Sequence, residues 1–73
     1  MRAWTYTVEQ CNSRIEELEE IIGACDEAIG LVDQILDLTF STGNAAEARG
    51  AMLRVRADAQ QAIRFWASRR PLP

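Results

Sequence analysis

The chain has 73 residues, a net charge of −3 and a pI near 4.8. A chain of this length forms one small domain, and its core alone rarely supplies more than about 3–5 kcal/mol of stability. Such domains usually depend on disulfides, a metal or a partner chain. Histidine is absent, and the two cysteines lie fourteen residues apart on one predicted helix, too far for a disulfide. We therefore expect no metal, no cofactor, and stabilisation by a partner chain.

The sequence gives no sign of a membrane or export segment. No stretch approaches the roughly eighteen apolar residues of a membrane span. The first twenty residues carry several acids and lack the apolar centre of a signal peptide. Two free thiols also fit a reducing compartment. We expect a cytoplasmic protein, or one assembled in the cytoplasm into a virion.

The first predicted helix runs from about residue 8 to residue 39, after a lead-in over residues 1–6. Thr7 and Gln10 have the spacing of a capping box. Gly23 and Gly30 each cost about 1 kcal/mol relative to alanine, and either bend the helix or occupy tolerated surface positions. Apolar residues recur at steps of three and four, as in a coiled-coil seam: Val8, Cys11, Ile15, Leu18, Ile22, Cys25, Ile29, Val32 and Leu36.

A loop over residues 40–44 and a second helix over residues 45–69 follow. Gly43 is expected to take positive φ, and Asn44 with Glu47 has the spacing of a second capping box. Pro71 ends the helix, so residues 70–73 form a tail. The second seam is rich in small residues, which allow close packing against large ones: Ala45, Ala48, Met52, Val55, Ala59, Ala62 and Trp66.

Because a short loop makes consecutive helices antiparallel neighbours, the predicted fold is all-α. It is one domain over residues 1–73, a long, coiled-coil-like helical hairpin. Residues 1–40 carry a charge of −7 and residues 41–73 a charge of +4. All basic residues are arginines, which favours paired contacts between the helices. The alternative is two solvated faces of opposite sign.

One hairpin cannot cover all of its apolar residues. With the loop centred near residues 42 and 43, residue i faces residue 85 − i, and Arg69 lies opposite Glu16. The chain before Glu16 then overhangs the second helix, so we predict partner-binding residues there: Trp4, Tyr6, Val8, Cys11 and Ile15. The predicted core or oligomer seam comprises Leu18, Ile22, Cys25, Ile29, Val32, Leu36, Met52, Val55 and Trp66.

On each predicted helix, further apolar residues lie beside the seam and widen its apolar side. Wide apolar stripes mark interaction surfaces. On the first helix these further residues are Ile21, Ala28, Leu31, Ile35 and Leu38; on the second they are Leu53, Ile63, Phe65 and Ala67. Since isologous dimers are the commonest oligomers, we expect self-association into a four-helix bundle. Trp66 is interpreted as a core residue, with an interface anchor as the alternative.

The chemistry of the side chains argues against catalysis and nucleic-acid binding. The usual bases, histidine and lysine, are missing, as is a glycine-rich phosphate loop. Glu16, Glu20 and Glu27 form a solvated acidic face. The low pI disfavours phosphate binding, so Arg49 and Arg56 are expected to pair with carboxylates of the other helix or another chain.

The two ends of the chain carry a short resemblance to a known family. Tyr6-Thr7-Val8-Glu9-Gln10 and Ile63-Arg64-Phe65-Trp66 resemble the ends of bacteriophage head–tail joining proteins of the gpW-like kind. That family has a glycine-rich β-hairpin between its helices, where this chain continues the heptads, and no functional residue is carried over. The resemblance implies a structural role in a phage particle.

The sequence therefore predicts a non-enzymatic protein–protein interaction or assembly module, such as a connector-type phage protein. The alternative is a small, phage-encoded or cellular regulator that inhibits a cellular protein. In that alternative, the acidic helical face of Glu16, Glu20 and Glu27 makes the contact.

Overall fold

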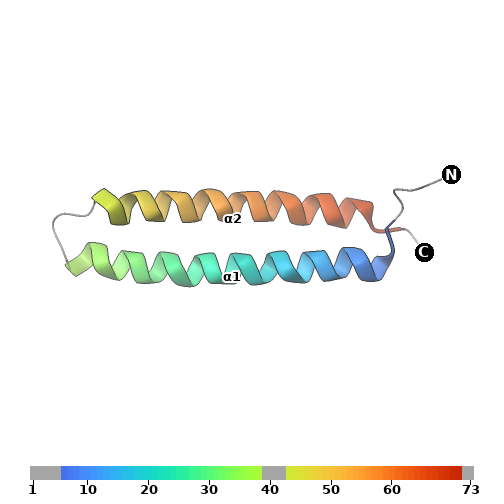
Figure 1. The fold of residues 1–73 in the computed structure, drawn as a ribbon, viewed down its shortest axis with the longest axis horizontal. Coiled ribbons are helices and arrows are strands. Elements are labelled where there is room, and N and C mark those ends of the chain that lie inside the picture. Colours follow the sequence, from blue (N-terminus) through green and yellow to red (C-terminus); the bar gives the residue numbers. More distant parts are fainter. Residues whose placement is uncertain (1–5, 39–42, 72–73) are drawn as a thin grey trace.

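The fold is a pair of long antiparallel helices. The computed structural model describes residues 6–38 and 43–71, which form α1 (Val8–Leu38) and α2 (Gly43–Arg69). The two helices lie side by side over their whole lengths (Figure 1). No strand occurs in these two ranges. The predicted all-α helical hairpin is confirmed, whereas Trp4 and most of the predicted loop lie outside the described residues.

The hairpin is a rod. Its extents are 59 × 17 × 14 Å, and its radius of gyration is 16.9 Å, whereas a compact domain of this length has a radius of gyration of about 11 Å. In the described part of the chain, only Cys11, Cys25 and Ala59 are buried. Two helices thus shield one narrow line of side chains and leave the remaining apolar surface in contact with solvent.

The predicted capping box starts α1. The Thr7 backbone N–H donates to Gln10 Oε1 at 2.9 Å, and the Gln10 backbone N–H donates to Thr7 Oγ1 at 3.0 Å. The Cys11 N–H donates to the Thr7 carbonyl at 3.1 Å. The first two bonds satisfy donors that a helix N-terminus otherwise leaves unpaired, and the third is the first backbone bond of the helix. The beginning of α1 is therefore encoded locally, by residues next to one another in the chain.

Gly23 and Gly30 are surface positions of one continuous helix. Both are exposed, and a Cβ built on either meets no heavy atom within 4 Å. The chain's own second helix does not approach them closely. Of the two interpretations of these glycines, the structure supports the tolerated surface position.

Replacing these glycines should stabilise the hairpin. Gly23→Ala and Gly30→Ala should each raise the free energy of unfolding by about 0.5–1 kcal/mol, because alanine has the higher helix propensity and the site is open. Thermal unfolding followed by circular dichroism tests this. A lower melting temperature in either variant would show that the glycine serves a close contact with another molecule.

The second helix begins earlier than predicted, at Gly43 instead of Ala45. Gly43 has no positive φ, and Asn44 lies inside the first turn, so the predicted end of the loop at residue 44 and the second capping box are wrong. Residues 40–42 of the predicted loop lie outside the described residues. The glycine and asparagine that resemble a turn in the sequence are accommodated in the helix.

This earlier start changes the register of the hairpin. In three hydrogen-bonded pairs, Asp33 with Arg49, Asp26 with Arg56, and Asn12 with Arg70, the two residue numbers add up to 82, not the expected 85. A shift of three residues moves α2 about 4.5 Å further along α1. The predicted bare overhang is therefore wrong, because the end of α2 covers Cys11, which is 0% exposed.

The seam of α1 is as predicted except at its first residue, Val8, which is 41% exposed, and that of α2 differs at one point. The seam residues of α1 from Cys11 to Leu36 are buried or half-buried, and so are those of α2 except Val55. Val55 is 47% exposed, and the half-buried residue at this level is its neighbour Arg56. The long aliphatic stem of an arginine can line a helix contact while its guanidinium group reaches the solvent.

Candidate interaction surface

One face of the hairpin carries paired polar side chains and is termed the polar face. Arg49 Nε donates to Asp33 Oδ1 at 2.8 Å, and Arg56 Nε donates to Asp26 Oδ1 at 2.6 Å. Nearer the chain ends, the guanidinium of Arg70 donates to Asn12 Oδ1 at 3.1 Å. Successive α1 acceptors are seven or fourteen residues apart, so they repeat along one side of the helix. The predicted pairing of Arg49 and Arg56 with carboxylates is confirmed.

We expect the ion pairs to specify the register more than they stabilise the fold. The Arg56 and Asp26 side chains are 34% and 53% exposed, and exposed pairs usually contribute about 0.2–1 kcal/mol. A double-mutant cycle with Asp26→Ala and Arg56→Ala should give a coupling energy of about 0.5 kcal/mol that falls with added salt. Urea unfolding measures it. A salt-independent coupling of several kcal/mol would contradict this assignment.

The opposite face follows from the same geometry. Asp26 and Asp33 each come one residue after a seam residue of α1, and their partners Arg49 and Arg56 flank the contact on the same side. Because each helical residue is rotated by about 100°, residues just before the seam positions lie on the other side. On α1, Ile21, Ala24, Ala28, Leu31 and Ile35 each precede a seam residue.

We call this surface the apolar face. Its large side chains on α1 are Ile21 and Leu31, which are 42% and 56% exposed, and it continues toward the loop with Ile35 and Leu38. On α2 it includes Val55 and Phe65, which are 47% and 44% exposed, together with the small residues Ala48, Ala51 and Ala62. One charged residue, the exposed Asp58, lies between Val55 and Phe65 on this face, because it precedes the seam residue Ala59. The hairpin therefore has a polar face with paired charges and an apolar face on the opposite side.

An aromatic cluster closes the end of the hairpin where α1 begins and α2 ends (Figure 1). The Tyr6 ring meets Trp66 edge to face, with 4.9 Å between centroids, and Phe65 meets Trp66 in the same way at 5.3 Å. The Arg69 guanidinium carbon lies 4.5 Å from the centroid of Phe65. Such contacts contribute beyond the area they bury, so Trp66 joins the two ends of the chain within one molecule.

The predicted partner-binding residues do not form one exposed tip. Cys11 is buried and Ile15 is half-buried in the contact with α2, while Tyr6 is half-buried and packs on Trp66. Val8 is 41% exposed. Trp4 lies outside the described residues. Of the four described members, only Val8 presents a largely accessible side chain.

The residues of the predicted acidic face are on the surface, whereas the two cysteines are buried between the helices. Glu16, Glu20 and Glu27 are exposed, and none of them forms an ion pair within residues 6–38 and 43–71. Cys11 and Cys25 are free thiols, and both are buried. Buried thiols behave as small apolar side chains, and these two pack in the seam.

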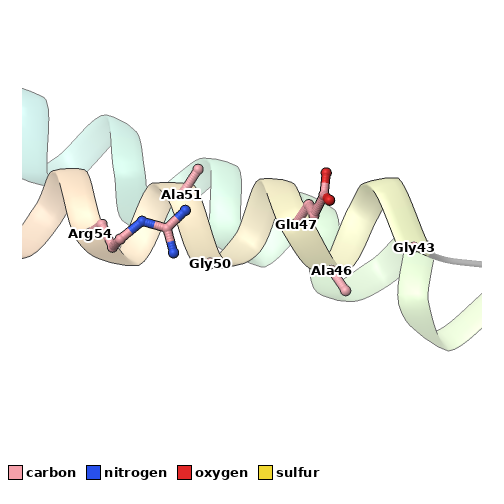
Figure 2. Close-up of a pocket in the computed structure, with 6 residues that line it drawn as sticks. All are labelled: Gly43, Ala46, Glu47, Gly50, Ala51 and Arg54. Atoms are coloured by element: carbon pink, nitrogen blue, oxygen red, sulfur yellow. The ribbon is translucent and has the colours of Figure 1, made fainter.

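A hollow of ≈ 550 Å³ lies along the first three turns of α2. Its walls are Gly43, Ala46, Glu47, Gly50, Ala51 and Arg54. Figure 2 shows the Arg54 side chain extending along the helix toward Gly50, where a built Cβ would lie 3.6 Å from Arg54 Nη1. The hollow exists because four of these six residues are glycine or alanine, which leave space between Glu47 and Arg54. It adjoins the apolar face through Ala51.

Within the ranges that the structure describes, no group of three or more histidine, cysteine or acidic residues is placed to hold a metal ion. None of the helical segments described is both long and apolar enough to cross a membrane. The chain matches no family model, no curated protein and no solved structure in the three comparisons made.

The sequence predicts only part of the apolar face. Ile21, Ala28, Leu31, Ile35 and Leu38 were recognised as a widening of the first stripe. Val55 was assigned to the seam, and the contribution of Ala48, Ala51 and Ala62 to an exposed surface was missed. The signal was available in Ala51 and Phe65, which each precede a seam residue of α2, as Ile21 and Leu31 do on α1.

Proposed function

We propose that this chain is a non-enzymatic protein–protein interaction module whose apolar face docks helices of a protein partner. The observation that carries the proposal is the contrast between the two faces of the hairpin. One face carries three polar pairs and one large exposed apolar residue, Leu53, whereas the other exposes Ile21, Leu31, Val55 and Phe65 by more than two fifths each. Continuous exposed apolar surface on a small protein typically marks an interaction site.

The first form of this function is assembly, as a component of a larger particle such as a connector-type phage protein. The repeated, elongated apolar face supports it, since such a surface suits side-by-side packing of helices. In this form the chain acts in the cytoplasm before incorporation into a virion. Two buried free thiols fit that reducing compartment.

The second form is a small regulator that binds a cellular protein. It is favoured by the exposed, unpaired carboxylates of Glu16, Glu20 and Glu27 on α1 within the described ranges. They would meet a basic surface, and complementary charge accelerates such encounters. The apolar face would then hold the regulator together as a dimer.

Light scattering coupled to gel filtration, over a wide range of protein concentration, tests the proposal. We expect the chain to associate. A discrete dimer supports the regulator, and rings or larger oligomers support the assembly component. A folded, helical monomer at every concentration would contradict the proposed function, because its apolar face would be stable in water without a partner.

A further inference from the structure

The exposed area of the hairpin is large enough for a stable interface with a partner of its own size. The chain exposes 5786 Å², whereas a compact monomer of 8.2 kDa exposes about 4,500 Å². The excess is roughly 1,300 Å², and a standard stable interface buries about 800 Å² on each partner. One contact along the rod would remove most of this excess.

The apolar face has the size pattern of a surface that fits a copy of itself. Residue numbers that add up to 82 or 83 lie at the same height along the rod, as the polar pairs show. On the apolar face three pairs, each with one residue from α1 and one from α2, lie at the same height: Leu31 with Ala51, Ala28 with Val55, and Ile21 with Ala62. At each of these three heights one helix carries a large residue and the other an alanine, a combination that allows interdigitation. At the height of Ala24 the residue on α2 is Asp58.

Two symmetric arrangements can bring the apolar faces of two copies together. If the two-fold axis runs along the rod, α1 of one copy lies over α2 of the other, and both loops are at the same end. If the axis runs across the rod, α1 lies over α1, and the loops are at opposite ends. The first arrangement keeps the height of every residue, so Leu31 meets Ala51 of the other copy.

Charge distinguishes these arrangements. α1 contains nine carboxylates and one arginine, for a charge of −8, whereas α2 contains five arginines and two carboxylates, for a charge of +3. An axis across the rod would align two helices of charge −8. An axis along the rod places each α1 between two basic helices, its own α2 and the α2 of the other copy.

We propose that the apolar face binds a second copy of the chain with the two-fold axis along the rod, forming a four-helix bundle. In this bundle each α1 packs between its own α2 and the α2 of the other copy. Leu31 of each copy sits against Ala51 of the other, at the edge of the hollow seen in Figure 2. This inference rests on the proposed interaction function and specifies its partner.

A crossed disulfide tests the arrangement. Leu31→Cys and Ala51→Cys variants are purified separately, mixed, and oxidised; a bond between positions 31 and 51 must then join two copies. The native thiols are 0% and 6% exposed, so the introduced thiols should react first. We expect the mixture to yield a 31–51 linked peptide by mass spectrometry. Leu31→Cys mixed with Leu53→Cys is the matched control, because Leu53 is 43% exposed but follows the seam residue Met52.

A second measurement uses Leu31→Glu and Leu53→Glu. We expect Leu31→Glu to weaken dimerisation at least about thirtyfold, the change typical of a hot-spot residue, and Leu53→Glu to leave it within about threefold. Absence of the 31–51 bond while light scattering still shows a dimer would overturn this arrangement but not the proposed function. If Leu53→Glu abolished dimerisation and Leu31→Glu did not, this arrangement would also be overturned, but the proposed function would not. A folded monomer of the unmodified chain would overturn both.

Discussion

Replacing Ile22 by aspartate should abolish the cooperative folding of the chain. Ile22 is a half-buried member of the α1 seam, three residues before the buried Cys25. A carboxylate placed there must remain charged against an apolar surface, at a cost of at least about 3 kcal/mol. A domain of this size has only about 3–5 kcal/mol to lose. Circular dichroism at 25 °C should show a large loss of helical signal, and light scattering a loss of association.

Gln34→Asp is the matched control for Ile22→Asp. It adds the same charge to the same helix, but at an exposed position. Surface substitutions of this kind usually change stability by less than about 0.5 kcal/mol. If Ile22→Asp kept the helicity and mass of the unmodified chain, the contact between α1 and α2 would not run along Ile22. If both variants unfolded, net charge would be the cause.

Replacing Trp66 by alanine is expected to have the second large effect. Trp66 is half-buried, meets the rings of Tyr6 and Phe65, and lies at the end of the hairpin where no loop connects the helices. Removing it should reduce the free energy of unfolding by about 3 kcal/mol, in the range for large aromatic residues in a core. Urea unfolding followed by circular dichroism would measure the change.

The neighbouring Phe65 provides the comparison for this experiment. Its ring is 44% exposed and contacts Trp66 and Arg69. Phe65→Ala, measured at a protein concentration where the chain is monomeric, should cost about 1 kcal/mol, the value of a partly exposed aromatic contact. An equal or larger loss for Phe65→Ala would contradict the assignment of Trp66 as the main intramolecular contact at this end of the hairpin.

The helices of this fold are predictable because their signals are local. Thr7 and Gln10 are three residues apart and cap each other, so the beginning of α1 can be read from the sequence. The repeat from Cys11 to Leu36 contains large apolar residues at almost every seam position, which defines the contact face of α1. The pairing of Arg49 and Arg56 with carboxylates follows from the opposite charges of the two halves.

The register of the hairpin and the contact face of α2 could not be predicted in the same way. Alanine occurs on both flanks of α2, for example at Ala51 before a seam residue and at Ala67 after one, and it does not distinguish a buried position from a half-exposed one. Val55 therefore suggested a seam position that Arg56 occupies in the structure. The register depends on where α2 begins, and Gly43 with Asn44 favours a turn locally although both continue the helix.

The same uncertainty extended to the candidate site. With a register error of three residues, the N-terminal end of α1 is predicted to extend beyond α2, although α2 covers it in the structure. The partner-binding surface is therefore predicted at Tyr6, Cys11 and Ile15. The apolar face depends less on the register, because Ile21 and Leu31 precede seam residues whatever lies opposite them. Its large residues on α1 are therefore predicted from the sequence, whereas on α2 only Phe65 is.

The paired residues of the polar face also determine the order in which the hairpin can fold. Asp33 and Arg49 are 16 residues apart in the chain, Asp26 and Arg56 are 30 apart, and Asn12 and Arg70 are 58 apart. The free-energy cost of closing a loop, which is entropic, rises by about 0.6 kcal/mol for each doubling of the loop length. Contacts beside the loop therefore form first and shorten the closure needed for the next ones. We therefore expect the contact between the helices to form from the loop toward Trp66, and thermal unfolding to begin at the Trp66 end.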